Sequence, residues 1–334
     1  MLKVGKVPES VLTRSIIRQI KTKRDEIVIG AGVGEDCAAI QLAEGELFVT
    51  STDPITGTGH DVGALSVHVT ANDIASSGAE VIGIMLSILL PEGTEESELR
   101  QIMQQVEEVC GRLNIQTVGG HTEVTSVVNQ PVITATGIGK VRADKLVTTA
   151  GAMAGDDVVI TKWIGLEGTS IIAKEEEEHL RRRFPASLVD TAKGFEQFLS
   201  VVADAREATA VGVTAMHDVT EGGVFGALWE VAEASGVGLD VELLDIPVRQ
   251  ETVEICEEYG ISPYQLISSG SMLITTKDGP EVVRRLKAAG INAAVIGKVT
   301  EGRDRILRNG DELRYLTPPV ADELYKVIRR KDDK

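Results

Sequence analysis

Cysteine, aromatic residues and positive charge are scarce in this chain of 334 residues. Cys37, Cys110 and Cys256 are odd in number and widely spaced, which argues against a disulfide framework and a paired-cysteine metal site. Phe, Trp and Tyr make up 3% of the residues, too few for platforms on which nucleic-acid bases stack. The net charge of −17 disfavours nucleic acid and anionic membranes as partners.

Long hydrophobic runs are also absent. The strongest, VIGIMLSILL at 81–90, is about half the length that a membrane-spanning helix needs. The N-terminal MLKVGKVPES lacks the apolar core of a signal sequence. We therefore expect a cytoplasmic protein, and the length suits two domains of ordinary size.

The first half alternates β-type runs with two helical segments, which predicts an α/β or α+β domain. The expected strands are a strand–turn–strand unit at 26–42 and single strands at 46–55, 81–90, 115–121 and 132–141. The expected helices are 63–78 and 96–114, and the second has a regular amphipathic pattern.

A Gly-rich, charged stretch at 144–156 predicts a domain boundary, after which strands and helices alternate again. In the second half we expect a solvated helical stretch at 174–184 and helices at 195–212, 224–236, 250–259 and 280–290. The expected strands are 158–166, 237–244, 271–276, 293–299 and 305–310.

Four acidic or Gly-rich turns recur at the ends of expected strands or the openings of helices. They are GVGEDCAAI (32–40), STDPI (51–55), TANDIASSG (70–78) and GGHTEV (119–124). Oxygen ligands converging on one point suit Mg²⁺, and nearby glycines let backbone N–H groups approach phosphates. Neither a Walker A motif nor G-x-G-x-x-G is present, which argues against a P-loop or Rossmann nucleotide-binding domain.

These turns, followed in order by MHDVTEGG (216–223), resemble the PurM-like superfamily. Its members include aminoimidazole ribonucleotide synthetase, thiamine-monophosphate kinase, selenophosphate synthetase and the hydrogenase-maturation dehydratase HypE. The resemblance implies an ATP-binding domain at 1–148, whose strands form a barrel across a homodimer, and an α-β sandwich domain at 149–334. It also implies ATP-dependent phosphorylation of a substrate oxygen, with Mg²⁺ and ATP as cofactors.

Carried over position by position, the resemblance implies one set of metal ligands and one set of nucleotide-binding residues in the first half of the chain. The implied metal ligands are Asp36, Asp53, Asp73 and Glu123. The implied nucleotide contacts there are Gly34, Asp36, Thr52, Asp53, Asn72, Gly119, Gly120, His121 and Thr122. His121 stands where the family often has a carboxylate, which Mg²⁺ prefers, and Glu123 is the candidate to supply that charge.

In the second half the resemblance implies that the turn after MHD faces phosphate or substrate. Asp218 joins Asp73 as an implied catalytic residue, and Thr220, Gly222 and Gly223 are implied binding residues. The turn precedes a helix, a position suited to anions because the first N–H groups of a helix are free. N-capping of that helix is the structural alternative for Asp218.

The overall sequence pattern most resembles the HypE branch, including IPV at 246–248 and ISPYQLISSGSMLITT at 261–276. HypE carries its substrate on a C-terminal cysteine, whereas the last thiol here is Cys256. We expect an enzyme acting on a small or carrier-bound substrate, with a maturation protein as a possible partner. The alternatives are an enzyme like selenophosphate synthetase or thiamine-monophosphate kinase, a nucleotide-binding scaffold without turnover, and a structural α/β protein.

Overall fold

The computed structural model describes residues 2, 4–32, 37–56 and 61–328, which form two compact units. The first unit comprises residues 1–75 and 79–146, and the second comprises 76–78 and 147–334. The expected boundary after residue 148 stays a prediction. Among the described residues, no helix is both long and apolar enough to cross a bilayer.

The first unit is built on a five-stranded sheet in the order β1-β6-β5-β7-β4. Only the β5–β6 pair is parallel; the other pairs are antiparallel. The strands are β1 (Gly5–Lys6), β4 (Glu46–Ile55), β5 (Glu80–Pro91), β6 (Gln116–Thr125) and β7 (Val132–Arg142), and β2 (Ile27–Ile29) pairs separately with β3 (Ala39–Ile40). The helices are α1 (Glu9–Val11), α2 (Val62–Ser76) and α3 (Glu96–Leu113), with a π-helical turn at Leu12–Ile16 and a 3-10 turn at Ile17–Gln19.

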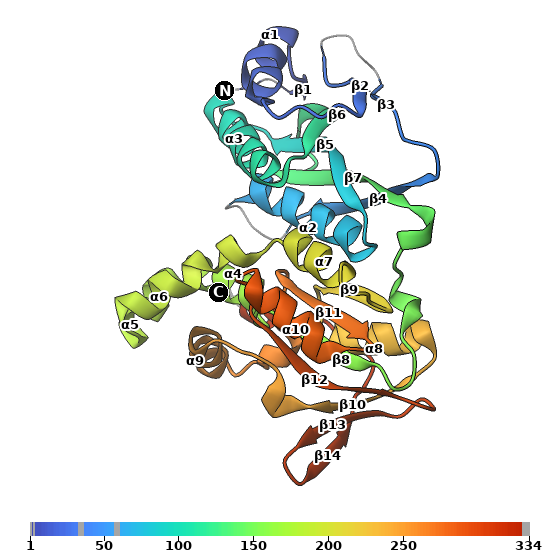
Figure 1. Cartoon of the computed structure of the whole chain (residues 1–334). Coiled ribbons are helices and arrows are strands. Elements are labelled where there is room, and N and C mark those ends of the chain that lie inside the picture. The colour runs from blue at the N-terminus through green and yellow to red at the C-terminus, as the bar shows by residue number, and fades with distance from the viewer. Residues whose placement is uncertain (1, 3, 33–36, 57–60, 329–334) are drawn as a thin grey trace. The chain divides into compact units, whose positions relative to one another are not determined.

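Helices α2 and α3 lie along one face of this sheet (Figure 1). Glycines in β7 allow α2 to approach closely, because a Cβ at Gly137 would lie 2.6 Å from Cγ2 of Thr70. The amphipathic pattern of α3 buries side chains at helical spacing, among them Leu99, Val106 and Cys110. One face of the sheet is therefore closed by helices.

The second unit is built on a seven-stranded sheet in the order β14-β13-β10-β12-β8-β11-β9. Its strands are β8 (Asp157–Thr161), β9 (Ala215–Val219), β10 (Gly238–Glu242), β11 (Ser271–Thr276), β12 (Ala293–Thr300), β13 (Arg305–Asn309) and β14 (Glu312–Tyr315). Its helices are α4 (Leu166–Glu175), α5 (Glu177–Arg183), α6 (Ala186–Lys193), α7 (Val202–Thr209), α8 (Gly223–Ser235), α9 (Gln250–Tyr259), α10 (Gly279–Ala288) and α11 (Leu324–Ile328). Every residue of β8 and β11 is buried, as expected for central strands covered on both faces.

Two expectations in the second half are corrected. The single helix expected at 195–212 is a 3-10 turn at Gly194–Phe198 followed by the separate helix α7. The strand expected at 158–166 ends at Thr161, after which Lys162 takes a left-handed φ of 53° and Leu166 begins α4. In both cases the apolar run of the sequence continues past the residue at which the backbone changes conformation.

Candidate active site

Two of the expected metal ligands lie together in the first unit. Strand β4 presents Ser51 and Asp53 on the same face, because side chains two residues apart in a strand point the same way. The Ser51 hydroxyl donates to Oδ2 of Asp73 at 2.6 Å and lies 3.4 Å from Oδ2 of Asp53. The hydroxyl thus bridges the carboxylates of β4 and α2, beside the fully buried Asn72.

The chemistry of this carboxylate pair fits Mg²⁺. Magnesium is usually held by one or two carboxylates and completes its shell with water and phosphate oxygens. Within the described part of the chain, no three His, Cys, Asp or Glu side chains are grouped to hold a metal. Two other expected contacts, Gly34 and Asp36, lie outside the described residues.

The remaining expected metal ligand, Glu123, lies on the opposite face of the sheet from Asp53, and its role as a metal ligand stays a prediction. The strand register pairs Glu123 with Leu89 and pairs Thr52 with Thr136. All four of these residues lie on one face of the sheet. Oε2 of Glu123 lies 3.2 Å from Nε2 of His121, so these two side chains pair with each other. Alternation along β6 therefore separates Glu123 from the bridged carboxylates.

Thr52 and its neighbours make a hydroxyl-rich patch on that same face. The Thr52 hydroxyl donates to the carbonyl of Ala135 at 3.1 Å and lies 2.9 Å from Oγ1 of Thr136. Ser87 is aligned with both Thr134 and His121 across the neighbouring strands. The expected nucleotide contacts Thr52 and His121 thus belong to a polar surface that α2 and α3 do not cover.

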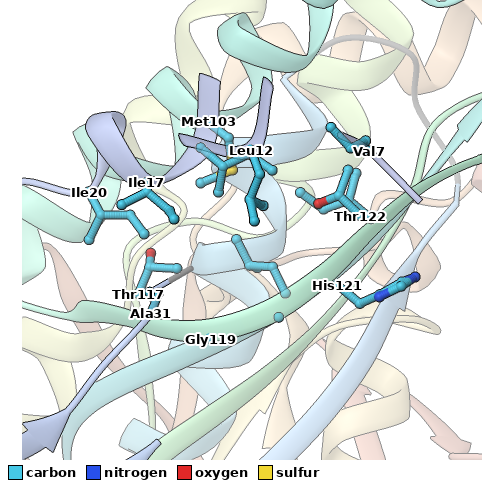
Figure 2. Close-up of a pocket in the computed structure, with 15 residues that line it drawn as sticks. Val7, Leu12, Ile17, Ile20, Ala31, Met103, Thr117, Gly119, His121 and Thr122 are labelled. Carbon is cyan, nitrogen blue, oxygen red and sulfur yellow. The ribbon is translucent and has the colours of Figure 1, made fainter. Parts of the chain in front are cut away.

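A cavity of about 350 Å³ opens beside the Gly119–Gly120 pair of β6. Figure 2 shows Leu12, Ile17 and Met103 gathered near the strand that carries Gly119. His121 and Thr122 also border the cavity, so it is lined by four of the expected nucleotide contacts, Gly119, Gly120, His121 and Thr122. The combination of aliphatic walls and exposed backbone suits a ligand with a flat apolar part and a polar part.

The N-terminal segment that closes this cavity is tied to α3. Nε and Nη2 of Arg14 each donate to one oxygen of Glu96 at 2.6 Å, and the Ser15 hydroxyl donates to the same carboxylate at 2.7 Å. These hydrogen bonds hold the pKa of Glu96 down at about 2. A bidentate arginine pair fixes orientation as well as distance, so the position of Leu12 and Ile17 is defined.

Gly120 can only be glycine at this place. Its φ is +149°, and a Cβ would lie 2.1 Å from the carbonyl oxygen of Leu86 on β5. The missing side chain lets β5 and β6 approach each other closely at this position. This is the physical reason for the glycine at 120, whereas a Cβ at Gly119 would make an ordinary contact, 3.4 Å from Cε of Met85.

In the second unit, β9 carries the expected catalytic residue Asp218, which is 5% exposed. Ser76, which also belongs to this unit, donates its hydroxyl to Oδ1 of Asp218 at 3.1 Å. The preceding His217 points to the other face of the strand, where Nε2 lies 2.7 Å from Oε2 of Glu230. Asp218 and His217 therefore do not form a dyad.

The turn after β9 does not offer the free N–H groups that we expected at its glycines. The N–H of Gly222 donates to Oδ2 of Asp322 at 2.8 Å, and the N–H of Gly223 donates to the carbonyl of Thr220 at 3.1 Å. The anion at this end of α8 is thus a carboxylate of the chain itself. No local pattern predicts this contact, because Asp322 is 100 residues further along the chain.

A second carboxyl, Glu167, which belongs to none of the sequence motifs, lies near this turn. It is in the first turn of α4, is 4% exposed, and accepts the N–H of Ser269 at 3.3 Å. Burial raises the pKa of Glu167 to about 7, and the carboxylates of Asp322 and Glu221 add to the effect. The only sequence signal was an acidic residue inside an apolar run, IGLEGTSII.

Comparison with known proteins identifies the family and the fold. Residues 34–141 match the family model for the AIR synthase related protein, N-terminal domain, and residues 153–308 match the model for its C-terminal domain. A putative hydrogenase expression/formation protein of Methanocaldococcus jannaschii is 26% identical, with 97% of each chain covered. Carbamoyl dehydratase HypE of Cupriavidus necator is 29% identical over 80% of this chain and 77% of that protein. The solved structure of hydrogenase maturation protein HypE in complex with ATP has a TM-score of 0.78 at 21% identity, covering 97% of each chain, and so shares the fold.

Proposed function

The chain belongs to the AIR synthase related protein family, and we propose that it is an ATP- and Mg²⁺-dependent enzyme that phosphorylates an oxygen of a small or carrier-bound substrate. Relatives across nearly the whole chain include a hydrogenase expression/formation protein, and a HypE relative carries the name carbamoyl dehydratase. Phosphorylation converts a poor leaving oxygen into a good one, which is the activation that a dehydration requires.

The observation that carries this proposal is the cavity beside Gly119 and Gly120. Its aliphatic walls suit a nucleoside base, and the backbone of the paired glycines suits the polar remainder of the nucleotide. Asp53 and Asp73 would hold Mg²⁺, which neutralises charge that develops on the phosphates during transfer. Asn72, fully buried beside Asp73, would help to fix the orientation of that carboxylate.

A cavity-filling substitution tests the nucleotide site directly. Ile17→Trp adds a large side chain to the lining, and we expect MgATP affinity, measured by calorimetry, to fall at least tenfold. Val127→Trp is the matched control, because Val127 is 80% exposed in the same unit and does not line the cavity. Equal affinity of both variants and the parent would refute the placement of the nucleotide.

Turnover is tested by phosphorus NMR of the protein with MgATP, alone and with a pool of small metabolites. We expect ADP and a new phosphorus signal, and the chemical shift of that signal indicates the acceptor. ATP signals that broaden without product would favour the alternative of a nucleotide-binding scaffold. Unchanged ATP signals would refute both.

The proposal also covers the oligomeric state and a protein partner. By its resemblance to the PurM-like superfamily, the chain would form a homodimer through the sheet face that carries Thr52 and Ser87, which α2 and α3 leave open. A maturation protein is the proposed further partner, as the names of the relatives suggest. Light scattering on the purified protein measures the dimer, and a monomeric mass would contradict it.

A further inference from the structure

The C-terminal part of the described chain crosses the turn that follows β9. Residues 319–328, here called the C-terminal strap, place Asp322 against this turn with only 4% of its surface exposed. Oδ2 of Asp322 accepts the N–H of Gly222 at 2.8 Å. Oδ1 accepts the N–H groups of Ile267 at 3.2 Å and of Leu324 at 2.8 Å. One carboxylate therefore joins three segments that are distant in sequence.

Other contacts of the strap lead to the same place. The N–H of Glu323 donates to the carbonyl of Gln265 at 3.4 Å, and the Tyr325 hydroxyl donates to Oε1 of Glu221 at 2.6 Å. Leu324 and Val327 are buried in a hydrophobic cluster with residues of α4, α6 and α9. The strap is thus anchored by packing on one side and by hydrogen bonds to the turn on the other.

The two glycines of the turn allow it to pack closely against the segment that Asp322 also contacts. Gly222 and Gly223 both have left-handed φ values, +80° and +61°. A Cβ on Gly223 would lie 2.6 Å from the carbonyl oxygen of Tyr264, so the turn packs directly on the backbone that Asp322 also holds. The carboxylate also faces the positive end of α8, an orientation that favours negative charge.

We propose that Asp322 is a positioning residue, through which the C-terminal strap fixes the turn that presents Thr220 and follows Asp218. The functional part of this inference rests on the proposed function, in which the turn faces the phosphate-bearing substrate. Asp322 itself has its acceptor atoms directed to backbone N–H groups and acts through them. Without it, three N–H donors, two of them buried, lose their partner, and the turn loses its link to the Ile267 segment.

Hydrogen exchange measured by mass spectrometry tests the positioning role without any assay of activity. In Asp322→Ala we expect at least tenfold faster amide exchange in peptides covering 217–226 and 263–270, with peptides from β10 unchanged. Asp311→Ala is the control, since Asp311 is an exposed carboxylate in the hairpin between β13 and β14. Unchanged exchange in the turn, or equal acceleration throughout the second unit, would overturn the proposal.

Two further variants separate the carboxylate from the packing of the strap. Leu324→Ala removes buried apolar surface but leaves Asp322 in place, so we expect a lower unfolding midpoint with the turn still protected. Loss of turn protection equal to that of Asp322→Ala would assign the effect to packing and overturn the role of the carboxylate. If Asp322→Ala does not fold, Tyr325→Phe tests whether the strap holds the turn, because it removes the hydrogen bond to Glu221. We expect faster amide exchange only in peptides covering 217–226. Unchanged exchange in these peptides would contradict the role of the strap.

A comparison of binding with turnover links the turn to function. MgATP affinity of Asp322→Ala is expected to equal that of the parent, while ATP turnover falls at least tenfold. Undiminished turnover despite a loosened turn would overturn the functional part of this inference. Failure of the parent to bind MgATP would instead refute the proposed function, and the exchange result would stand by itself.

Discussion

Glu167→Gln is expected to make the second unit more stable at alkaline pH. The pKa of Glu167 in the folded protein is about 7, against 4.5 for the unfolded chain. The folded state therefore holds a proton that the unfolded state releases, and the stability present below pH 4.5 is lost as pH rises toward and through 7. The pKa difference corresponds to about 3 kcal/mol of unfolding free energy, and glutamine removes this loss.

Tryptophan fluorescence is the appropriate assay, because both tryptophans of the chain, Trp163 and Trp229, belong to the second unit. Urea unfolding at pH 5 and pH 8 then compares the Gln variant with the parent. We expect a variant more stable than the parent by about 3 kcal/mol at pH 8 and by much less at pH 5. The exposed Glu178→Gln on α5 is the control.

The same dependence on pH in the parent and in Glu167→Gln would refute the reasoning. It would mean that Glu167 ionises in the folded protein as it does in the unfolded chain. The burial of its carboxyl beside Asp322 and Glu221 would then carry no electrostatic cost.

Three further predictions follow from ion pairs and the bridged carboxylates. Hydrogen bonds from Arg24 lower the pKa of Glu26 to about 2, so its contribution to stability is lost as pH falls from 4.5 toward 2, and circular dichroism should show that Glu26→Gln reduces this acid sensitivity. Asp204→Asn leaves the buried ammonium of Lys162 without its partner at 2.6 Å, and urea unfolding followed by fluorescence should show a loss of about 3–5 kcal/mol. Asp73→Asn should weaken Mg²⁺-dependent ATP binding at least tenfold in calorimetry while leaving the free energy of unfolding within about 1 kcal/mol of the parent; unchanged binding would contradict the metal site.

Several strands and helices could be predicted from the sequence, because a local residue pattern determines them. The run ELFVTSTDPI predicted a strand at 46–55, and β4 has the same bounds. The apolar spacing of 96–114 predicted a helix, and α3 ends one residue earlier, where Asn114 takes a left-handed conformation. The two-domain PurM-like fold expected from the ordered motifs is confirmed by the family models and by the shared fold of HypE.

The bridged carboxylates show where sequence reasoning succeeds in part. Asp53 and Asp73 were expected at one site from the resemblance, and the structure brings them together through Ser51. The hydroxyl stood in the quoted motif STDPI, yet nothing local marks it as the bridge, because the partner on α2 is 22 residues away. Their roles as metal ligands stay predictions.

From the sequence alone we could predict the class of fold, many of the strands and helices, and the turns that carry the candidate site residues. Hydrophobic periodicity and turn-forming residues are local features of the sequence, so they can be recognised without knowing which distant segments pack against them. Which residues share a face became evident only in the folded chain, because alternation along β6 turns Glu123 away from Asp53. Only the tertiary structure also supplied Asp322 to the turn at Gly222, because a contact across 100 residues leaves no periodic trace in the chain.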